Sequence, residues 1–167
     1  MSDESIDRTL AAIRDLYTTN LATHGLSSKS VGWRDEASQV LRFERLAQVI
    51  RRDGHPEGFT VADWGCGYGA MYAYLQATCG DALREYVGYD ISREMIASAT
   101  TAHAGAQARF VLGGQVTDDA DYTFVSGTFN VRFQATPEEW GQYIRRTLES
   151  LWARSRHGLA FNLLTSH

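Results

Sequence analysis

Three glycines at alternate positions form a short turn that could bind a ligand through its backbone. Gly65, Gly67 and Gly69 lie in the stretch Val61-Ala-Asp-Trp-Gly-Cys-Gly-Tyr-Gly-Ala70, between a predicted strand and a predicted helix. Glycine reaches backbone conformations that are closed to other residues, and without a Cβ it leaves neighbouring amide groups open to a ligand. The spacing therefore predicts a small-molecule site at this turn.

The next predicted strand after the turn ends in an aspartate, which could bind another part of the same ligand. Asp90 ends the next predicted strand, 21 residues after Gly69, and a carboxylate there can accept hydrogen bonds from both hydroxyls of a ribose. In an open parallel sheet, ligands bind beyond the carboxyl ends of the strands. Turn, helix and acid occur in this order within 59–90, so we expect a nucleoside ligand.

Two classes of nucleoside cofactor fit these spacings. The stretch from Gly65 to Ala70 also satisfies the G-x-G-x-x-A pattern, which keeps an NAD(P)-dependent oxidoreductase as an alternative. The sequence has no Tyr-x-x-x-Lys pair for hydride transfer, because Lys29 is its single lysine. A catalytically silent cofactor-binding module is a second alternative.

The stretches around the turn and the acid resemble a known family. Asp-x-Gly-Cys-Gly-x-Gly, followed by Tyr-Asp-Ile-Ser-x-x-Met-Ile-x-x-Ala, is similar to the paired signature of class I S-adenosylmethionine-dependent methyltransferases, and the resemblance covers 59–164. It implies an enzyme that transfers a methyl group from S-adenosylmethionine. The Asn/Asp-Pro-Pro-Tyr/Phe sequence of enzymes that methylate nucleic-acid amines does not follow the fourth strand, which favours a small-molecule acceptor.

The resemblance also assigns residues. It places the methionine part of the cofactor at the turn, the ribose at Asp90 and the adenine against Ile91. The implied cofactor-binding residues are Asp63, Gly65, Cys66, Gly67, Gly69, Asp90, Ile91 and Gln115. Gln115 is included because Gly114 stands where family members commonly carry an acid, and Asp118 or Asp119 would serve only with a shifted loop. Substrate contacts are expected from Trp33, Ser126 and Asn130, while no catalytic base and no metal ligand is assigned.

A scaffold must bring these strand ends together. The predicted strands cover 59–64, 85–90, 108–112, 121–126 and 157–164, and helices over 70–78, 93–104 and 137–153 alternate with them. This alternation predicts βαβ units. We therefore expect an α/β fold, a doubly wound and mostly parallel sheet of five strands with helices on both faces, which the resemblance identifies as Rossmann-like.

Two further helices are predicted ahead of the first strand. One covers 3–23; the other begins near Arg34, stops at 53–56, and carries on one face Ala37, Val40, Leu41, Ala47 and Ile50. No linker rich in Pro, Gly or Ser follows. We therefore expect 1–167 to form a single methyltransferase domain, with 1–58 as a helical cap on the cofactor-binding core 59–167.

The last predicted helix has the clearest signals. Thr136 can cap it, Pro137 suits its first position, and Glu139 completes a capping box. Its expected buried face consists of Trp140, Ile144, Leu148, Leu151 and Trp152.

Composition makes several other classes improbable. The 167 residues carry a net charge of −4, whereas a protein that binds nucleic acid mainly through phosphates needs a basic surface. The start, MSDESIDRTL, is acidic and polar, and no stretch approaches 18 apolar residues, so we expect neither export nor a membrane span. Cys66 and Cys79 lack zinc-ligand spacing, and a core of this size needs no disulfide. We therefore expect a protein of the reducing cytoplasm.

The fifth strand needs a partner at its outer edge. The family sheet usually has seven strands, the last two forming a hairpin, whereas this sequence stops at His167 after a fifth. The chain is then a fragment, a minimal form, or one whose edge is covered by another chain. Because an uncovered apolar strand tends to pair, we expect a homodimer through the strand that carries Leu159, Ala160, Phe161, Leu163 and Leu164.

Overall fold

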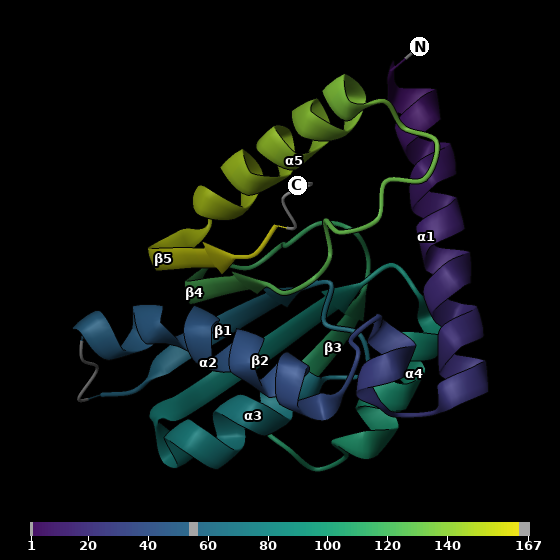
Figure 1. Cartoon of the computed structure of the whole chain (residues 1–167). Coiled ribbons are helices and arrows are strands. Elements are labelled where there is room, and N and C mark those ends of the chain that lie inside the picture. Colours follow the sequence, from purple (N-terminus) through teal and green to yellow (C-terminus); the bar gives the residue numbers. More distant parts are fainter. Residues whose placement is uncertain (1, 54–56, 164–167) are drawn as a thin grey trace.

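A parallel sheet lies at the centre of the computed structural model, which describes residues 2–53 and 57–163 (Figure 1). Within these residues the sheet has five strands in the order β3-β2-β1-β4-β5. The strands are β1 (Phe59–Trp64), β2 (Leu83–Asp90), β3 (Ala108–Leu112), β4 (Ala120–Val125) and β5 (Ser155–Phe161). All neighbouring pairs are parallel, which confirms the expected fold class.

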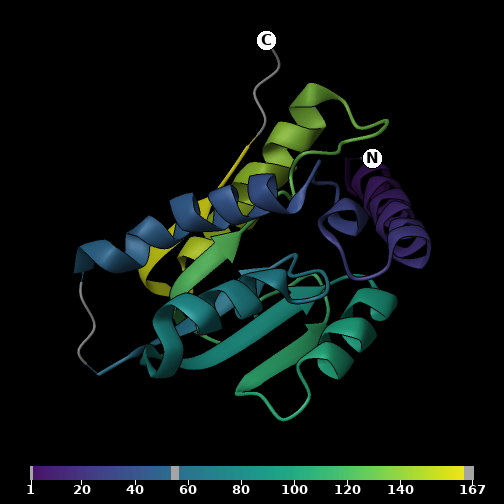
Figure 2. The ribbon, with the colours of Figure 1, turned by 60° about the horizontal axis from the view of Figure 1, so that its bottom comes forward.

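Helices cover both faces of this sheet. They are α1 (Ser2–His24), α2 (Glu36–Asp53), α3 (Ala70–Cys79), α4 (Arg93–Ala102) and α5 (Pro137–Trp152), with short 3₁₀ helices η1 (Ser28–Val31) and η2 (Gly80–Ala82). Figure 2 shows α2 and α3 side by side over one face. On the other face α5 crosses β4 and β5, while α1 packs against both α5 and α4 (Figure 1).

The alternation of side chains along the strands builds one core on each face. On β1, Val61 faces the α2–α3 layer, whereas Ala62 and Trp64 face α1 and α5. On β2, Tyr86 and Tyr89 point to these two layers in the same way. The chain proceeds from β1 outward in one direction and from β4 outward in the other, so the crevice expected of such a fold lies at the carboxyl ends of β1 and β4.

The buried face of α2 matches the predicted one at Ala47 and Ile50 but differs in the first half of the helix. Val40 and Leu41 are 41% and 48% exposed, whereas Gln39 and Phe43 are buried. The helical repeat is followed by the buried positions 39, 43, 46, 47 and 50. Because Gln39 is polar, the sequence pattern did not indicate that the buried face begins there. The helix begins at Glu36 because the Asp35 carboxylate accepts hydrogen bonds from the Ser38 amide at 2.8 Å and from its hydroxyl at 2.6 Å.

The last helix is confirmed with one correction. The capping box of Thr136 and Glu139 forms as predicted. Trp152, expected in the buried face, is 61% exposed, because it lies about 100° around the helix from the buried Leu151.

Several boundaries of the expected elements also shift. The fifth strand covers Ser155–Phe161 rather than 157–164, and the second begins at Leu83. Leu164, His167 and the predicted helix stop at 54–56 lie outside the described residues. In the part of the chain that the structure describes, every helix is too short or too polar to cross a bilayer.

Candidate functional site

The glycine turn is tied to the end of β2 by its backbone. The amide groups of Gly65 and Cys66 donate to the carbonyl oxygen of Tyr89, at 2.8 and 3.0 Å. Gly65 and Gly67 have φ angles of 78° and 55°. A Cβ on Gly65 would lie 2.3 Å from Thr128 Oγ1, and one on Gly67 would lie 2.9 Å from a methyl carbon of Val31. Both positions therefore require glycine, for conformation and for space.

Asp90 connects the turn to the next helix. One carboxylate oxygen accepts from the Gly67 amide at 2.9 Å, and the other accepts from the Ser92 amide at 2.8 Å. Ser92 in turn caps α4 through its hydroxyl, which accepts from the Met95 amide. Burial raises the pKa of Asp90, although the two backbone hydrogen bonds oppose this shift. A single carboxylate thus fixes the turn and the start of α4 at the carboxyl ends of the strands.

A cavity of about 630 Å³, here called the large cavity, opens beside this carboxylate. This volume lies within the range of roughly 300–1,000 Å³ that is usual for small-molecule sites. The residues expected from the sequence that line it are Gly65, Gly67, Asp90, Ile91, Gln115 and Ser126. The structure therefore brings together six of the eleven predicted positions at one site.

Three more predicted residues line a separate space of about 30 Å³, the small cavity. They are Asp63, Cys66 and Trp33. Val31, Gly65 and Ser126 line both cavities, so the two spaces meet at the turn. Trp33 packs against Gly127 after β4, and Val31 packs against Gly67, so the segment around η1 covers the turn from one side.

Asp63 is a buried acid next to the turn. Its side chain accepts a hydrogen bond from the Tyr86 hydroxyl inside the α2–α3 core. Burial raises its pKa to about 7, the Tyr86 hydrogen bond lowers it, and the nearby charge of Asp90 adds to the rise. Burial likewise raises the pKa of the Cys66 thiol. Asp63 and Cys66 therefore do not present ionised side chains to the large cavity.

Gly69 and Asn130 line neither cavity. A Cβ on Gly69 would lie 2.8 Å from the His103 ring, so this glycine gives space to a packing contact. The Asn130 side-chain oxygen is buried and has no hydrogen-bond partner among the described residues.

The loop after β3 brings Gln115 rather than an acid to the large cavity. Gln115 and Gly114 line the large cavity, and the Gly114 carbonyl accepts from the Trp64 indole at 3.0 Å. Asp118 pairs with Arg109 at 2.7 Å, and Asp119 pairs with Arg154 at 3.2 Å. Both acids are held away from the cavity lining, so the shifted loop that they would need is not present.

Residues of α1 and α5 complete the large cavity, and the sequence analysis did not identify them. They are Leu10, Ile13 and Tyr17 on α1, and Tyr143, Arg146, Thr147, Ser150 and Leu151 on α5. On each helix these positions are three or four residues apart, so they share one face. On α5, polar residues beside the apolar stripe were the signal in the sequence that this face borders a cavity. Tyr17 lies near enough to Asp90 for that carboxylate to help burial raise the pKa of the tyrosine.

Within 2–53 and 57–163, no group of three or more His, Cys, Asp or Glu side chains is placed to hold a metal ion.

The fold and the site together define an open, doubly wound α/β domain with the large cavity at its switch point, bordered by the glycine turn and Asp90. Residues 61–153, which are more than half of the chain, match the family described as a methyltransferase domain. The chain therefore belongs to this family, the class I methyltransferases, whose members depend on S-adenosylmethionine.

One sequence relative is a protein of Mycobacterium tuberculosis, Rv1506c, named as a candidate methyltransferase. It is 42% identical over 110 residues, which are 65% of this chain and 65% of the relative. The aligned part is thus just under two thirds of that protein.

Solved structures show the same fold at low identity. The DhpI-SAM-HEP complex is 20% identical, with 97% of this chain and 67% of that chain covered and a TM-score of 0.61. Magnesium protoporphyrin IX methyltransferase (ChlM) from Synechocystis PCC 6803 with bound SAH is 16% identical, with 88% and 68% covered and a TM-score of 0.60.

Proposed function

We propose that the protein is an S-adenosylmethionine-dependent methyltransferase that acts on a small molecule. The observation that carries this proposal is the arrangement of Asp90, which holds the Gly67 amide and lines the same cavity as the bare backbone of Gly65 and Gly67. A ribose-binding acid and an open peptide turn therefore border one space of suitable volume.

The residues of the site fit the parts of this cofactor. Asp90 is placed to accept hydrogen bonds from ribose hydroxyls, since a carboxylate that already accepts two backbone amides keeps further lone pairs. Ile91 and Gln115 border the region for the adenine, and Gly65 and Gly67 border that for the methionine part. Asp63 and Cys66 lie behind the turn and support it, which makes their contribution to cofactor binding indirect.

When bound, S-adenosylmethionine supplies a methyl group that its sulfonium already activates. The protein then has to align the acceptor and exclude water, and orientation of this kind can supply roughly 7–11 kcal/mol. Val31 and Trp33 cover the turn, and Ser126 lies where the two cavities meet. We therefore propose that Ser126, with Trp33 behind it in the small cavity, lies near the acceptor atom that receives the methyl group, and we leave Asn130 as a residue of the adjoining loop.

Binding to nucleosides tests the proposal. Isothermal titration calorimetry of the full chain with S-adenosylmethionine, S-adenosylhomocysteine and NAD should give micromolar binding of the first two and none of NAD. Binding of NAD instead would favour the oxidoreductase alternative, for which no comparison gives support. Binding of the adenosyl compounds without methyl transfer to a panel of small acceptors would favour a silent module.

We further propose that the helical cap and the core form one domain. The Thr18 hydroxyl lies 2.9 Å from the Ser92 hydroxyl, and α1 packs against both α4 and α5. Limited proteolysis should release neither 1–58 nor 59–167 as a stable piece under native conditions.

A homodimer through β5 also remains a proposal. β5 lies at one edge of the described sheet, and Phe161 and Leu163 are exposed there. Sedimentation velocity should show a dimer that Phe161→Glu weakens. A monomer at all concentrations would contradict this proposal.

A further inference from the structure

We propose that the half of the large cavity lined by α1 and α5 binds the methyl acceptor, and that Arg146 contacts an oxyanion of that acceptor. The acceptor is then an apolar or aromatic small molecule that carries a carboxylate or a similar anionic group. This inference rests on the proposed function, because it assigns the rest of the cavity to the cofactor.

The cavity divides naturally into two parts. The glycine turn, Asp90 and the loop after β3 supply one part, and these elements follow one another along the strand ends. The other part is a wall of two helices that the cofactor signature does not include. Since the signature residues suffice to contact an adenosyl group, the helical wall is available to a second ligand.

The helical wall is mainly apolar. Leu10 and Ile13 lie on one face of α1, three residues apart, and Leu151 lies on α5. The Trp64 ring and Val116 add apolar surface from the sheet side. An aromatic or aliphatic body would be desolvated against this surface, at roughly 25 cal/mol per Å² of apolar area buried.

Polar groups interrupt this apolar wall at one place. Tyr143, Thr147 and Ser150 lie four and three residues apart on α5, with Arg146 beside them. Burial raises the pKa of Tyr143, a shift that the neighbouring Thr147 side chain opposes, so the Tyr143 hydroxyl stays protonated and can donate. These side chains add hydroxyl groups next to the guanidinium.

The two charged residues that line the large cavity stand on different elements. Among the described residues that line the large cavity, Arg146 is the single cation and Asp90 the single acid. Asp90 belongs to the turn, whereas Arg146 stands on the third turn of α5. A guanidinium presents several N–H donors in a fork that matches carboxylate geometry, so an anionic group is preferred at this end of the cavity.

A pair of probes that differ in charge alone tests the site. 2-Naphthoate and its neutral analogue 2-naphthamide are titrated by calorimetry into the full chain, with and without saturating S-adenosylhomocysteine. We expect the wild type to bind naphthoate more tightly than naphthamide, and Arg146→Gln to weaken naphthoate about tenfold while it leaves naphthamide unchanged.

Arg145→Gln is the matched control, because Arg145 and Arg146 are both exposed residues of α5 and Arg145 alone does not line the cavity. It removes the same charge from the same helix, and it should leave both affinities unchanged. Thermal unfolding of the two variants should match the wild type within about 1 °C, which separates a lost contact from a damaged fold.

Three results would overturn the proposal. They are equal binding of naphthoate to the wild type and to Arg146→Gln, equal weakening in Arg145→Gln, and no preference of the wild type for the anion. The titrations without S-adenosylhomocysteine decide the oxyanion site even if the nucleoside does not bind, whereas failure of nucleoside binding itself refutes the proposed function.

Discussion

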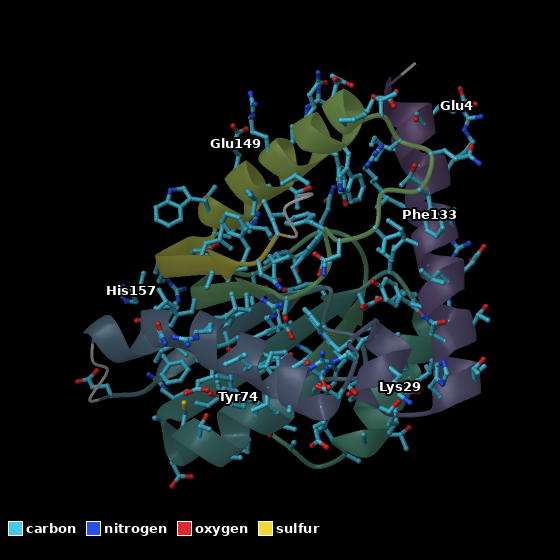
Figure 3. The ribbon with its side chains drawn as sticks, in the orientation of Figure 1. Glu4, Lys29, Tyr74, Phe133, Glu149 and His157 are labelled. Atoms are coloured by element: carbon cyan, nitrogen blue, oxygen red, sulfur yellow. The ribbon has the colours of Figure 1, made fainter. Side chains whose placement is uncertain are left out.

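The two sides of the large cavity are built by different kinds of contact. On the turn side, backbone amides of Gly65, Cys66 and Gly67 bond to residues at the end of β2, over distances of 2.8–3.0 Å. On the helical side, residues of α1 and α5, two helices far apart in the chain, line the cavity together. Figure 3 shows Glu149 of α5 pointing away from the sheet. Glu149 does not line the large cavity, whereas Tyr143 and Thr147 of the same helix do.

This difference indicates where change is tolerated. A backbone turn that needs positive φ and has no space for a Cβ accepts few substitutions. A helix face can exchange one side chain for another without altering the backbone, so it can be adapted to different acceptors. We therefore expect substitutions on the turn side to remove cofactor binding, and those on the helical wall to change specificity.

The largest effect is expected at Asp90. Asp90→Ala should lower the affinity for S-adenosylhomocysteine by about 100-fold or more, since hydrogen bonds to a charged group contribute roughly 1.5–3 kcal/mol each. Calorimetry measures the loss, and circular dichroism checks the fold. Asp119→Ala, at an exposed acid paired with Arg154, is the control and should bind normally. Unchanged affinity in Asp90→Ala would remove the basis of the cofactor site.

The free energy of unfolding should depend on pH through Asp63, which lies behind the turn. The pKa of Asp63 is raised to about 7, so the folded state holds this proton more tightly than the unfolded state does. Its contribution to stability is then fully present below the ordinary pKa of 3.8 and is lost as the pH rises through about 7. The wild type should lose about 2–3 kcal/mol more than Asp63→Asn between pH 5 and pH 8.

Urea unfolding of both proteins at the two pH values measures this difference. The pKa of Asp90 is also raised, so the unfolding free energy of the Asp63→Asn variant should still fall somewhat with rising pH. Equal slopes in the two proteins would show that Asp63 does not titrate in this range.

The glycines offer a matched pair on the two sides. Gly65→Ala should destabilise the fold by about 2 kcal/mol, because alanine is strained at φ 78° and its Cβ would meet Thr128. Gly141→Ala on α5 meets nothing within 4 Å and should stabilise the helix by roughly 0.5–1 kcal/mol. Denaturant midpoints of the two variants should move in opposite directions, and a shift in the same direction would contradict this account.

The smallest effect is expected where α1 attaches to the core. Thr18→Val removes the hydrogen bond to Ser92 and should cost about 1 kcal/mol of unfolding free energy. Thr23→Val, whose hydroxyl bonds to a carbonyl of its own exposed helix, should cost less. If the Thr18 variant also weakened naphthoate more than S-adenosylhomocysteine, the separate roles of the two sides would be supported.

Much of the fold could be predicted from local patterns. The predicted strands 59–64 and 108–112 match β1 and β3 residue for residue, because each is a short apolar run bounded by turns. The capping box at Thr136 could also be predicted, since all its contacts lie within four residues. The buried face of α2 was predicted correctly at Ala47 and Ile50 but wrongly in the first half of the helix, because Gln39 is buried by neighbours that its own sequence position does not identify.

The turn side of the large cavity could be predicted from the sequence alone. Turn, helix and acid are close together in the chain, and steric rules for glycine and parallel strands decide how they meet. Only the tertiary structure decided that Asp63 and Cys66 lie behind the turn and that Gly69 faces His103. It alone also joined α1 to α5, because the packing of side chains more than 120 positions apart depends on the whole sheet between them.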